Sequence, residues 1–180
     1  MVLSVDDVVA KFPMKTMPKI KGVPDYGNIN TMIQLLYGNA ALLPKTLGGG
    51  QHWHIGIIMN PQSYTILANT PYEIPPDPGI APTHATGASA AIRKTDFLVH
   101  KEERRIYDNH KTMENALKSI IIDAVNKVYI GELRNKYTGY LGITAHDLLD
   151  HLLDRYGKIT PTDVEECKNR WTIRSMPCNR

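Results

Sequence analysis

Hydrophobic residues recur at helical spacing over most of the second half of the chain. From residue 88 the pattern predicts one helix that ends near Asp108 and a second that begins at Thr112. In the second helix apolar positions follow every three or four residues, as in a helix with one buried face. These positions are Ala116, Leu117, Ile120, Ala124, Val128 and Leu133.

Two further helices are predicted after the turn at YTGYLG. Thr144 and Asp147 form a capping-box pattern, and the apolar helix that they open ends at Gly157. A last helix is predicted from Thr160 to about Trp171, with a proline in its first turn. The second half is therefore predicted to be an antiparallel helical bundle.

The first eighty residues are divided into shorter elements, because ten of the chain's twelve prolines lie between Pro13 and Pro82. The segment TPYEIPPDPGIAPTHATG is predicted to be an extended linker, since each proline disfavours helix in the residue before it. The apolar run IGIIM fits a short buried strand and the start of a helix equally well.

Three short helices are predicted in this first part from their capping residues. Ser4 with Asp7 indicates a brief helix before Pro13. Asn28 is the expected cap of a helix over residues 29–43, and Asn60 is the expected cap of a helix that begins with the following proline.

These patterns predict an all-α protein with three parts. Residues 1–83 are expected to be an irregular Pro/Gly-rich N-terminal region, residues 84–173 a helical bundle, and residues 174–180 a basic tail. The chain has 180 residues, of which 42% are hydrophobic and 22% are charged. This composition is typical of a globular domain and excludes a disordered protein.

The charge and the cysteine content of the chain indicate which partners and which cellular compartment to expect. Its formal net charge of +3 permits nucleic acid as a partner without requiring it. The two cysteines, Cys167 and Cys178, cannot build a disulfide framework or a four-cysteine zinc site. The sequence has neither the apolar run of a secretory signal at its start nor a stretch long enough for a membrane helix. We expect a cytoplasmic or nuclear protein without a membrane partner.

The stretch LGGGQHWHIG, residues 47–56, is the first candidate for chemistry. It lacks the lysine and hydroxyl residue that a phosphate-binding loop needs after its glycines. His52 and His54 could bind a metal only with a third ligand from elsewhere. We therefore expect a flexible turn with solvated histidines.

The stretch HDLLDH is the second candidate. Its histidines, His146 and His151, are five residues apart and so do not share a helix face as in HExxH proteases. Surface pairs of His146 with Asp150 and of Asp147 with His151 are expected instead. Cys167 lies beside two glutamates, which disfavour its thiolate, and no GxSxG motif occurs. We expect no enzymatic activity and no cofactor; a metal-dependent hydrolase that uses the His146 to His151 cluster is an alternative.

The last thirteen residues carry four basic residues and no acidic residue. Such a segment can contact RNA phosphates, and an aromatic side chain within it can stack on a base. The candidate RNA-binding residues are Lys168, Arg170, Trp171, Arg174 and Arg180.

Two long segments resemble a known family. LLPKTLGGGQHWHIGIIMNPQSY, and the region that begins HKEERRIYDNHKTMENALKS and ends YLGITAHDLLDHLLDRYGKIT, resemble Gag-like proteins of copia-type LTR retrotransposons, especially the diatom and algal forms. The resemblance covers most of the chain, roughly residues 18–168. It implies an all-α capsid region after a less regular N-terminal part. It also implies self-association into a shell that packages RNA, without chemistry of its own.

Two features of such Gag proteins have no counterpart in the sequence. A second helical capsid lobe and a zinc knuckle usually follow the first lobe, whereas here CKNRWTIRSMPCNR is the last segment. We therefore expect a truncated or rearranged copy. The leading hypothesis is a self-associating, capsid-like structural protein; an RNA-binding protein or a domesticated remnant without assembly is the alternative.

Overall fold

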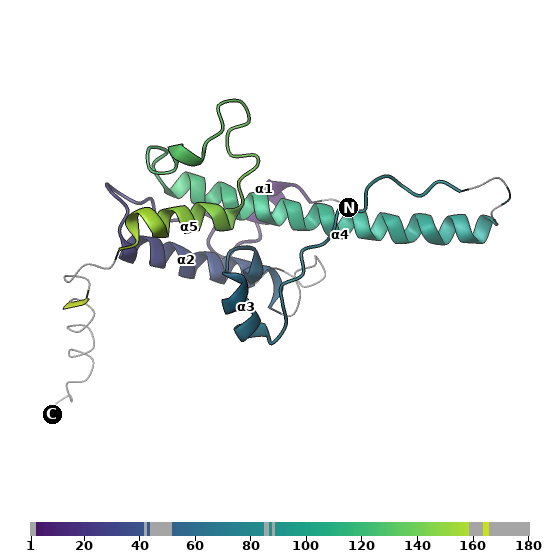
Figure 1. The fold of residues 1–180 in the computed structure, drawn as a ribbon, viewed down its shortest axis with the longest axis horizontal. Helices are drawn as coiled ribbons and strands as arrows, with labels where there is room; N and C mark the ends of the chain where they lie inside the picture. The colour runs from purple at the N-terminus through teal and green to yellow at the C-terminus, as the bar shows by residue number, and fades with distance from the viewer. Residues whose placement is uncertain are drawn as a thin grey trace.

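The computed structural model describes residues 3–41, 43, 52–84, 87, 89–158 and 164–165, and within them the protein is all-α (Figure 1). Five α-helices and two short 3-10 helices follow one another in these ranges, and an isolated antiparallel bridge joins Asn135 to Gly139. The predicted fold class is confirmed. None of these helices combines the length and the hydrophobicity of a membrane span.

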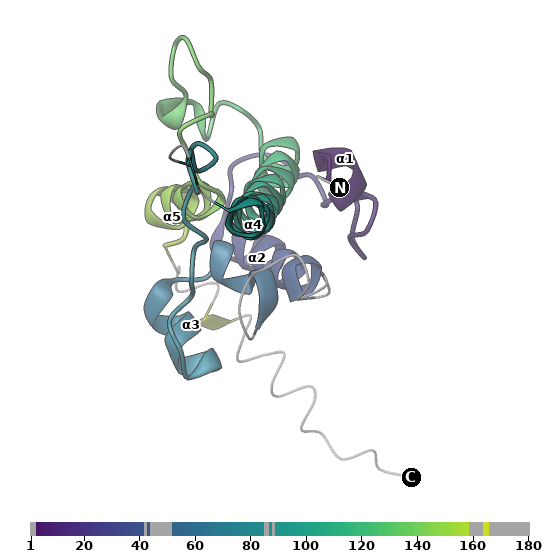
Figure 2. The same cartoon turned by 90° about the vertical axis from the view of Figure 1, so that its right-hand side faces the viewer.

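Three helices build the hydrophobic core: α2 (Tyr26–Ala41), the C-terminal half of α4 (Ala90–Ala124), and α5 (Ala145–Tyr156). Helix α5 contacts both α2 and α4, while α1 (Val5–Val9) covers another side of α4 (Figures 1 and 2). The interior is filled mainly by aliphatic and methionine side chains, which include Ile29, Met32, Leu36, Met113, Leu117, Ile121, Leu148, Leu149 and Leu152.

The two helices predicted to meet near residue 110 are a single helix, α4, of 35 residues. Thr112 was predicted to start a new helix, but its hydroxyl donates to the carbonyl oxygen of Asp108, 2.8 Å away, within the continuous helix. Hydroxyl side chains inside helices are commonly satisfied in this way, so this threonine does not mark a helix start. The buried stripe ends with the helix at Ala124, and Val128, predicted to continue it, is 79% exposed.

The first half of α4 stands clear of the other helices (Figure 1). Its buried residues begin at Asn109, and earlier side chains such as Phe97 are exposed. At 1.5 Å per residue the whole helix is about 50 Å long, so about half of this length projects from the core. The extended segment 71–84 runs beside this projecting half, where an ion pair of 3.1 Å joins Asp77 to Arg104.

The N-terminal part of the chain contributes directly to the core. Helix α1 opens with the predicted capping box, in which the Ser4 hydroxyl accepts from the Asp7 amide at 3.1 Å. Helix α2 begins three residues earlier than predicted, because Asp25 rather than Asn28 caps it; the Asp25 carboxylate accepts from the Asn28 amide at 2.7 Å. The core thus draws on both sides of the boundary predicted after residue 83.

A short helical unit connects α2 to the extended segment. The IGIIM run, which fitted either a strand or a helix, begins within a 3-10 helix, η2 (Trp53–Ile57). The predicted start of α3 (Pro61–Ala68) is confirmed, since the Asn60 side chain accepts from the Gln62 amide at 3.0 Å. The proline-rich residues after α3 have no regular secondary structure, as predicted.

Helix α5 has both of the predicted terminal signals. The Thr144 hydroxyl accepts from the Asp147 amide at 3.0 Å, and the Asp147 carboxylate accepts from the Thr144 amide at 2.9 Å. At the other end the Gly157 amide donates to the Leu153 carbonyl oxygen at 2.8 Å. A Cβ at position 157 would lie 2.5 Å from this oxygen, which explains the glycine there.

Substitution of the central core residue Leu117 by alanine is expected to lower the free energy of unfolding by about 2–5 kcal/mol, because it leaves a cavity between packed helices. Urea denaturation followed by circular dichroism measures this change. Val128→Ala is the control, since Val128 is exposed and its truncation should change stability by less than about 0.5 kcal/mol. Equal effects of the two substitutions would contradict the assignment of the core.

Candidate functional site

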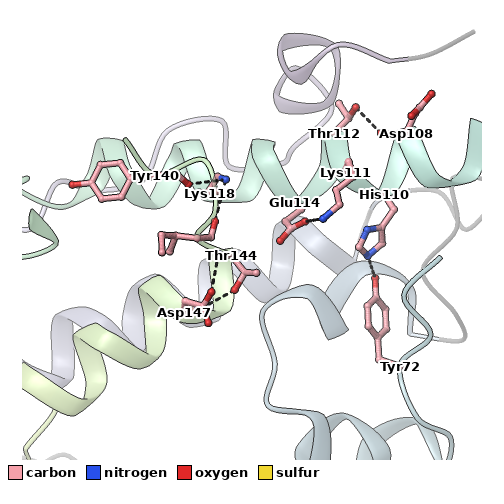
Figure 3. Close-up of polar contacts among 11 residues, drawn as sticks. Tyr72, Asp108, His110, Lys111, Thr112, Glu114, Lys118, Tyr140, Thr144 and Asp147 are labelled. Carbon is pink, nitrogen blue, oxygen red and sulfur yellow. Dashed lines mark hydrogen bonds and ion pairs between the residues drawn. The ribbon is translucent and has the colours of Figure 1, made fainter. Parts of the chain in front are cut away.

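Polar side chains gather where the middle of α4 meets η2, α3 and the first turn of α5. They border a cavity of about 310 Å³, called here the α4 cavity. Figure 3 shows Tyr72 reaching from the segment after α3 towards His110 of α4, with Glu114 further along the same helix. The residues that line the cavity and matter below are Gly56, Thr65, Tyr72, His110, Glu114 and His146.

Tyr72 joins the extended segment to α4 through a hydrogen bond. Its hydroxyl lies 3.1 Å from Nε2 of His110. Burial lowers the pKa of His110 and, together with the nearby Tyr64, raises the pKa of Tyr72. The contact is therefore a hydrogen bond between two neutral groups at pH 7.

Gly56 allows the ring of Tyr72 to lie directly on the backbone of η2. A Cβ at position 56 would come within 2.2 Å of two ring carbons of Tyr72. The same ring meets Tyr64 of α3 edge to face, with centroids 5.1 Å apart. Gly56, the last glycine of LGGGQHWHIG, therefore has a packing role.

Charged residues continue the polar surface along α4. The Glu114 carboxylate, on a largely buried side chain, accepts from Lys111 Nζ at 2.9 Å. One turn further on, Lys118 Nζ donates to the carbonyl oxygens of Tyr140 and Ile143 at 3.3 and 3.1 Å (Figure 3). Burial lowers the pKa of Lys118, and the charge of Glu114 opposes this shift. These contacts fasten the loop before α5 to α4.

His54 is fully buried in the structure, although the sequence predicted a solvated loop histidine. Neither of its ring nitrogens has a hydrogen-bond partner among the described residues. Burial, with a smaller effect of His110, lowers the pKa of His54 to about 4, so the ring is neutral at pH 7. The prediction was wrong because the local sequence is polar, whereas η2 packs this side of the chain against α2.

The two candidate metal sites do not gather enough ligands. His52 and His54 flank the start of a 3-10 helix rather than a strand, and His52 instead meets the Tyr64 ring edge to face, with centroids 6.5 Å apart. The described residues contain no group of three or more His, Cys, Asp and Glu side chains that could hold a metal ion.

The HDLLDH stretch forms one of its two predicted pairs. His146 Nδ1 lies 3.2 Å from the Asp150 carboxylate, as predicted for a pair four residues apart. The predicted pair of Asp147 with His151 is not formed, because Asp147 caps α5. Nε2 of His151 lies 3.0 Å from the carbonyl oxygen of Tyr129 instead.

Several predicted features lie outside the described residues. They are the three consecutive glycines, Cys167, Cys178, and all five RNA-binding candidates, Lys168, Arg170, Trp171, Arg174 and Arg180. The helix predicted from Thr160 also lies there, apart from Val164 and Glu165, which are helical. RNA binding by the basic segment stays a prediction from the sequence.

The α4 cavity was not predicted, although one signal for it exists in the sequence. His110, Glu114 and Lys118 follow one another at intervals of four within the helix that carries the core stripe. Polar residues at this spacing share one face of a helix and need partners when it is buried. Their partner Tyr72 lies in the proline-rich linker, which periodicity cannot place.

The chemistry of the cavity favours binding. Small-molecule sites are typically apolar hollows of at least about 300 Å³ with a few convergent polar groups, and the α4 cavity has this character. Comparison with models of protein families, with curated proteins and with solved structures found no match. The Gag resemblance therefore rests on the sequence segments quoted above.

Stability is expected to fall as the pH drops from about 6.5 towards 4, because His54 takes up a proton in the unfolded chain but not in its buried site. The loss from this group reaches about 3 kcal/mol, and His110, whose pKa is also lowered, adds in the same direction. Urea titrations between pH 7 and 4 should show a smaller loss for His54→Leu. His100→Leu, on the projecting half of α4, is the control. An unchanged pH dependence in His54→Leu would contradict the buried neutral ring.

Gly56→Ala is expected to destabilise the protein by about 1–3 kcal/mol, because the new methyl group must displace the Tyr72 ring. Gly38→Ala in α2 is the matched control, since a Cβ there meets no atom within 4 Å. In a helix interior this control should stabilise by about 0.5–1 kcal/mol. Thermal unfolding of both variants tests the close contact between the Tyr72 ring and the backbone at Gly56. An unchanged melting temperature in Gly56→Ala would contradict this contact.

Proposed function

We propose that this chain is a structural protein that self-associates through the projecting half of α4, as expected for a Gag-like capsid protein. The observation that supports this function is an apolar seam on a helix half that none of the other described helices covers. Its members, Ile92 and Val99, are 55% and 52% exposed, and Ile106 is half-buried.

The seam continues a line of core residues. Ile92, Val99, Ile106, Met113 and Ile120 follow one another at intervals of seven residues along α4. The last two of them are buried in the core. A repeat of seven keeps apolar residues on one side of a helix. The exposed part of the seam is therefore a surface suited to another helix.

The extended segment 71–84 leaves the seam accessible. It contacts α4 through Asp96, whose carboxylate lies 3.7 Å from His84 Nδ1, and through Arg104. At 100° per residue, Asp96 lies about 60° from Val99 around the helix, and Arg104 lies about 160° from Ile106. Leu98, also exposed, lies on the other flank and widens the apolar surface.

A second copy of the chain is the simplest partner for this surface. Two copies related by a two-fold axis would place the same seam against itself. Burial of an exposed aliphatic side chain contributes about 1.5–3 kcal/mol at most, and several such residues in each copy support a weak dimer. Weak and repeated contacts of this kind suit a protein that assembles into larger structures.

Val99→Asp is expected to weaken self-association by about tenfold or more, because it places a charge in the centre of the paired seam. Sedimentation equilibrium of the full chain over a wide concentration range measures the association constant. Circular dichroism checks that α4 is retained, since valine and aspartate have similar helix propensities.

Leu141→Asp is the matched control for this experiment. Leu141 is 76% exposed on the loop before α5, away from the seam, so its substitution should leave association unchanged. A wild-type protein that stays monomeric at high concentration would contradict the proposed function. Equal weakening by Leu141→Asp would assign the association to a different surface.

A further inference from the structure

The α4 cavity has walls of two kinds. Its apolar wall comes from η2, α3 and the residues that follow α3, including Ile57, Met59 and Pro61. Its polar wall comes from α4 and the first turn of α5, through residues such as His110 and Glu114. These walls are supplied by segments far apart in the sequence, and they border a volume of about 310 Å³.

One hydrogen-bonding atom in the polar wall is buried and unused. Nε2 of His110 is engaged by the Tyr72 hydroxyl, but Nδ1 has no hydrogen-bond partner among the described residues. The His110 side chain is almost completely buried. This nitrogen has no surface open to the cavity. A ligand in the cavity would therefore find its hydrogen-bond acceptor in the Glu114 carboxylate, which also lines it. On the same wall, Lys111 uses one oxygen of the Glu114 carboxylate.

The lysine and the glutamate that line the cavity already form an ion pair. Lys111 Nζ lies 2.9 Å from the Glu114 carboxylate. An ion that enters the cavity would lose part of its hydration without gaining a free counter-charge from this pair, which is unfavourable. A neutral ligand avoids this cost.

The shape of the wall favours a flat ring. Tyr72 and His110 present two rings with centroids 6.0 Å apart, and Tyr72 is held from behind by Tyr64 and Gly56. Aromatic rings pack well against such surfaces in stacked or edge-to-face arrangements. We propose that the α4 cavity binds an uncharged aromatic molecule that carries one hydrogen-bonding group.

This site is independent of the proposed self-association. The cavity lies beside the middle of α4, and Val99 of the seam lies on its projecting half, so the substitutions that test one leave the other intact. A ligand bound here would contact α3, α4 and α5 together and would stabilise their arrangement by mass action.

Three probes with the same ring system test the proposal on the full chain at neutral pH. They are 2-naphthol, which is uncharged, 2-naphthoate, which is an anion, and 2-naphthylmethylammonium, which is a cation. Fluorescence titration should show 2-naphthol binding about tenfold or more tightly than either ion. Absence of 2-naphthol binding, or tighter binding of an ion, would overturn the proposal.

Variants then locate the bound probe. Thr65→Phe places a ring in the cavity from the exposed face of α3 and should weaken 2-naphthol binding by about tenfold or more. Ile66→Phe, at the next and also exposed position of α3, does not line the cavity and should leave binding unchanged. Thermal unfolding verifies that both variants are folded. Equal binding by Thr65→Phe and the wild type would show that 2-naphthol binds elsewhere and would refute the site.

Discussion

The burial of the C-terminal half of α4 against α1, α2 and α5 is the constraint on which the rest of the structure depends. Met113, Leu117 and Ile121 are fully buried there, and each contributes about 1.5–3 kcal/mol by leaving water. Because α4 continues without a break through Thr112, this anchored half also fixes the direction of the projecting half. The exposed position of the seam is a consequence of that continuity.

The α4 cavity lies close to where the covered part of α4 begins. Hydrophobic core residues adjoin polar side chains here, and buried polar groups need hydrogen-bond partners. His110 is hydrogen-bonded to Tyr72 from the segment after α3. Lys118 donates to two carbonyl groups of the loop before α5. The contact of Tyr72 with His110 thus also brings together two groups that line the cavity. A binding site and a structural junction occupy one place because both need polar groups held inside a packed interior.

Much of the local structure could be predicted from the sequence. The caps at Ser4, Asn60 and Thr144 and the C-terminal glycine of α5 are all present, since each depends on contacts within four residues. The break predicted before Thr112 was wrong because its hydroxyl bonds within the helix instead of capping a new one. The prediction that His54 is solvated was wrong, because polar neighbours in the sequence do not show which elements cover a side chain in the fold. The cavity was missed for the same reason.

The sequence by itself determined the all-α class and the positions of most helix ends, because backbone hydrogen bonds and caps join near neighbours along the chain. Only the tertiary structure decided which half of α4 is covered, that His54 is buried, and that Tyr72 meets His110. These last two residues are 38 positions apart, with the proline-rich segment between them. No periodic pattern crosses such a segment, so their contact depends on how the residues after α3 pack against the core in the folded protein.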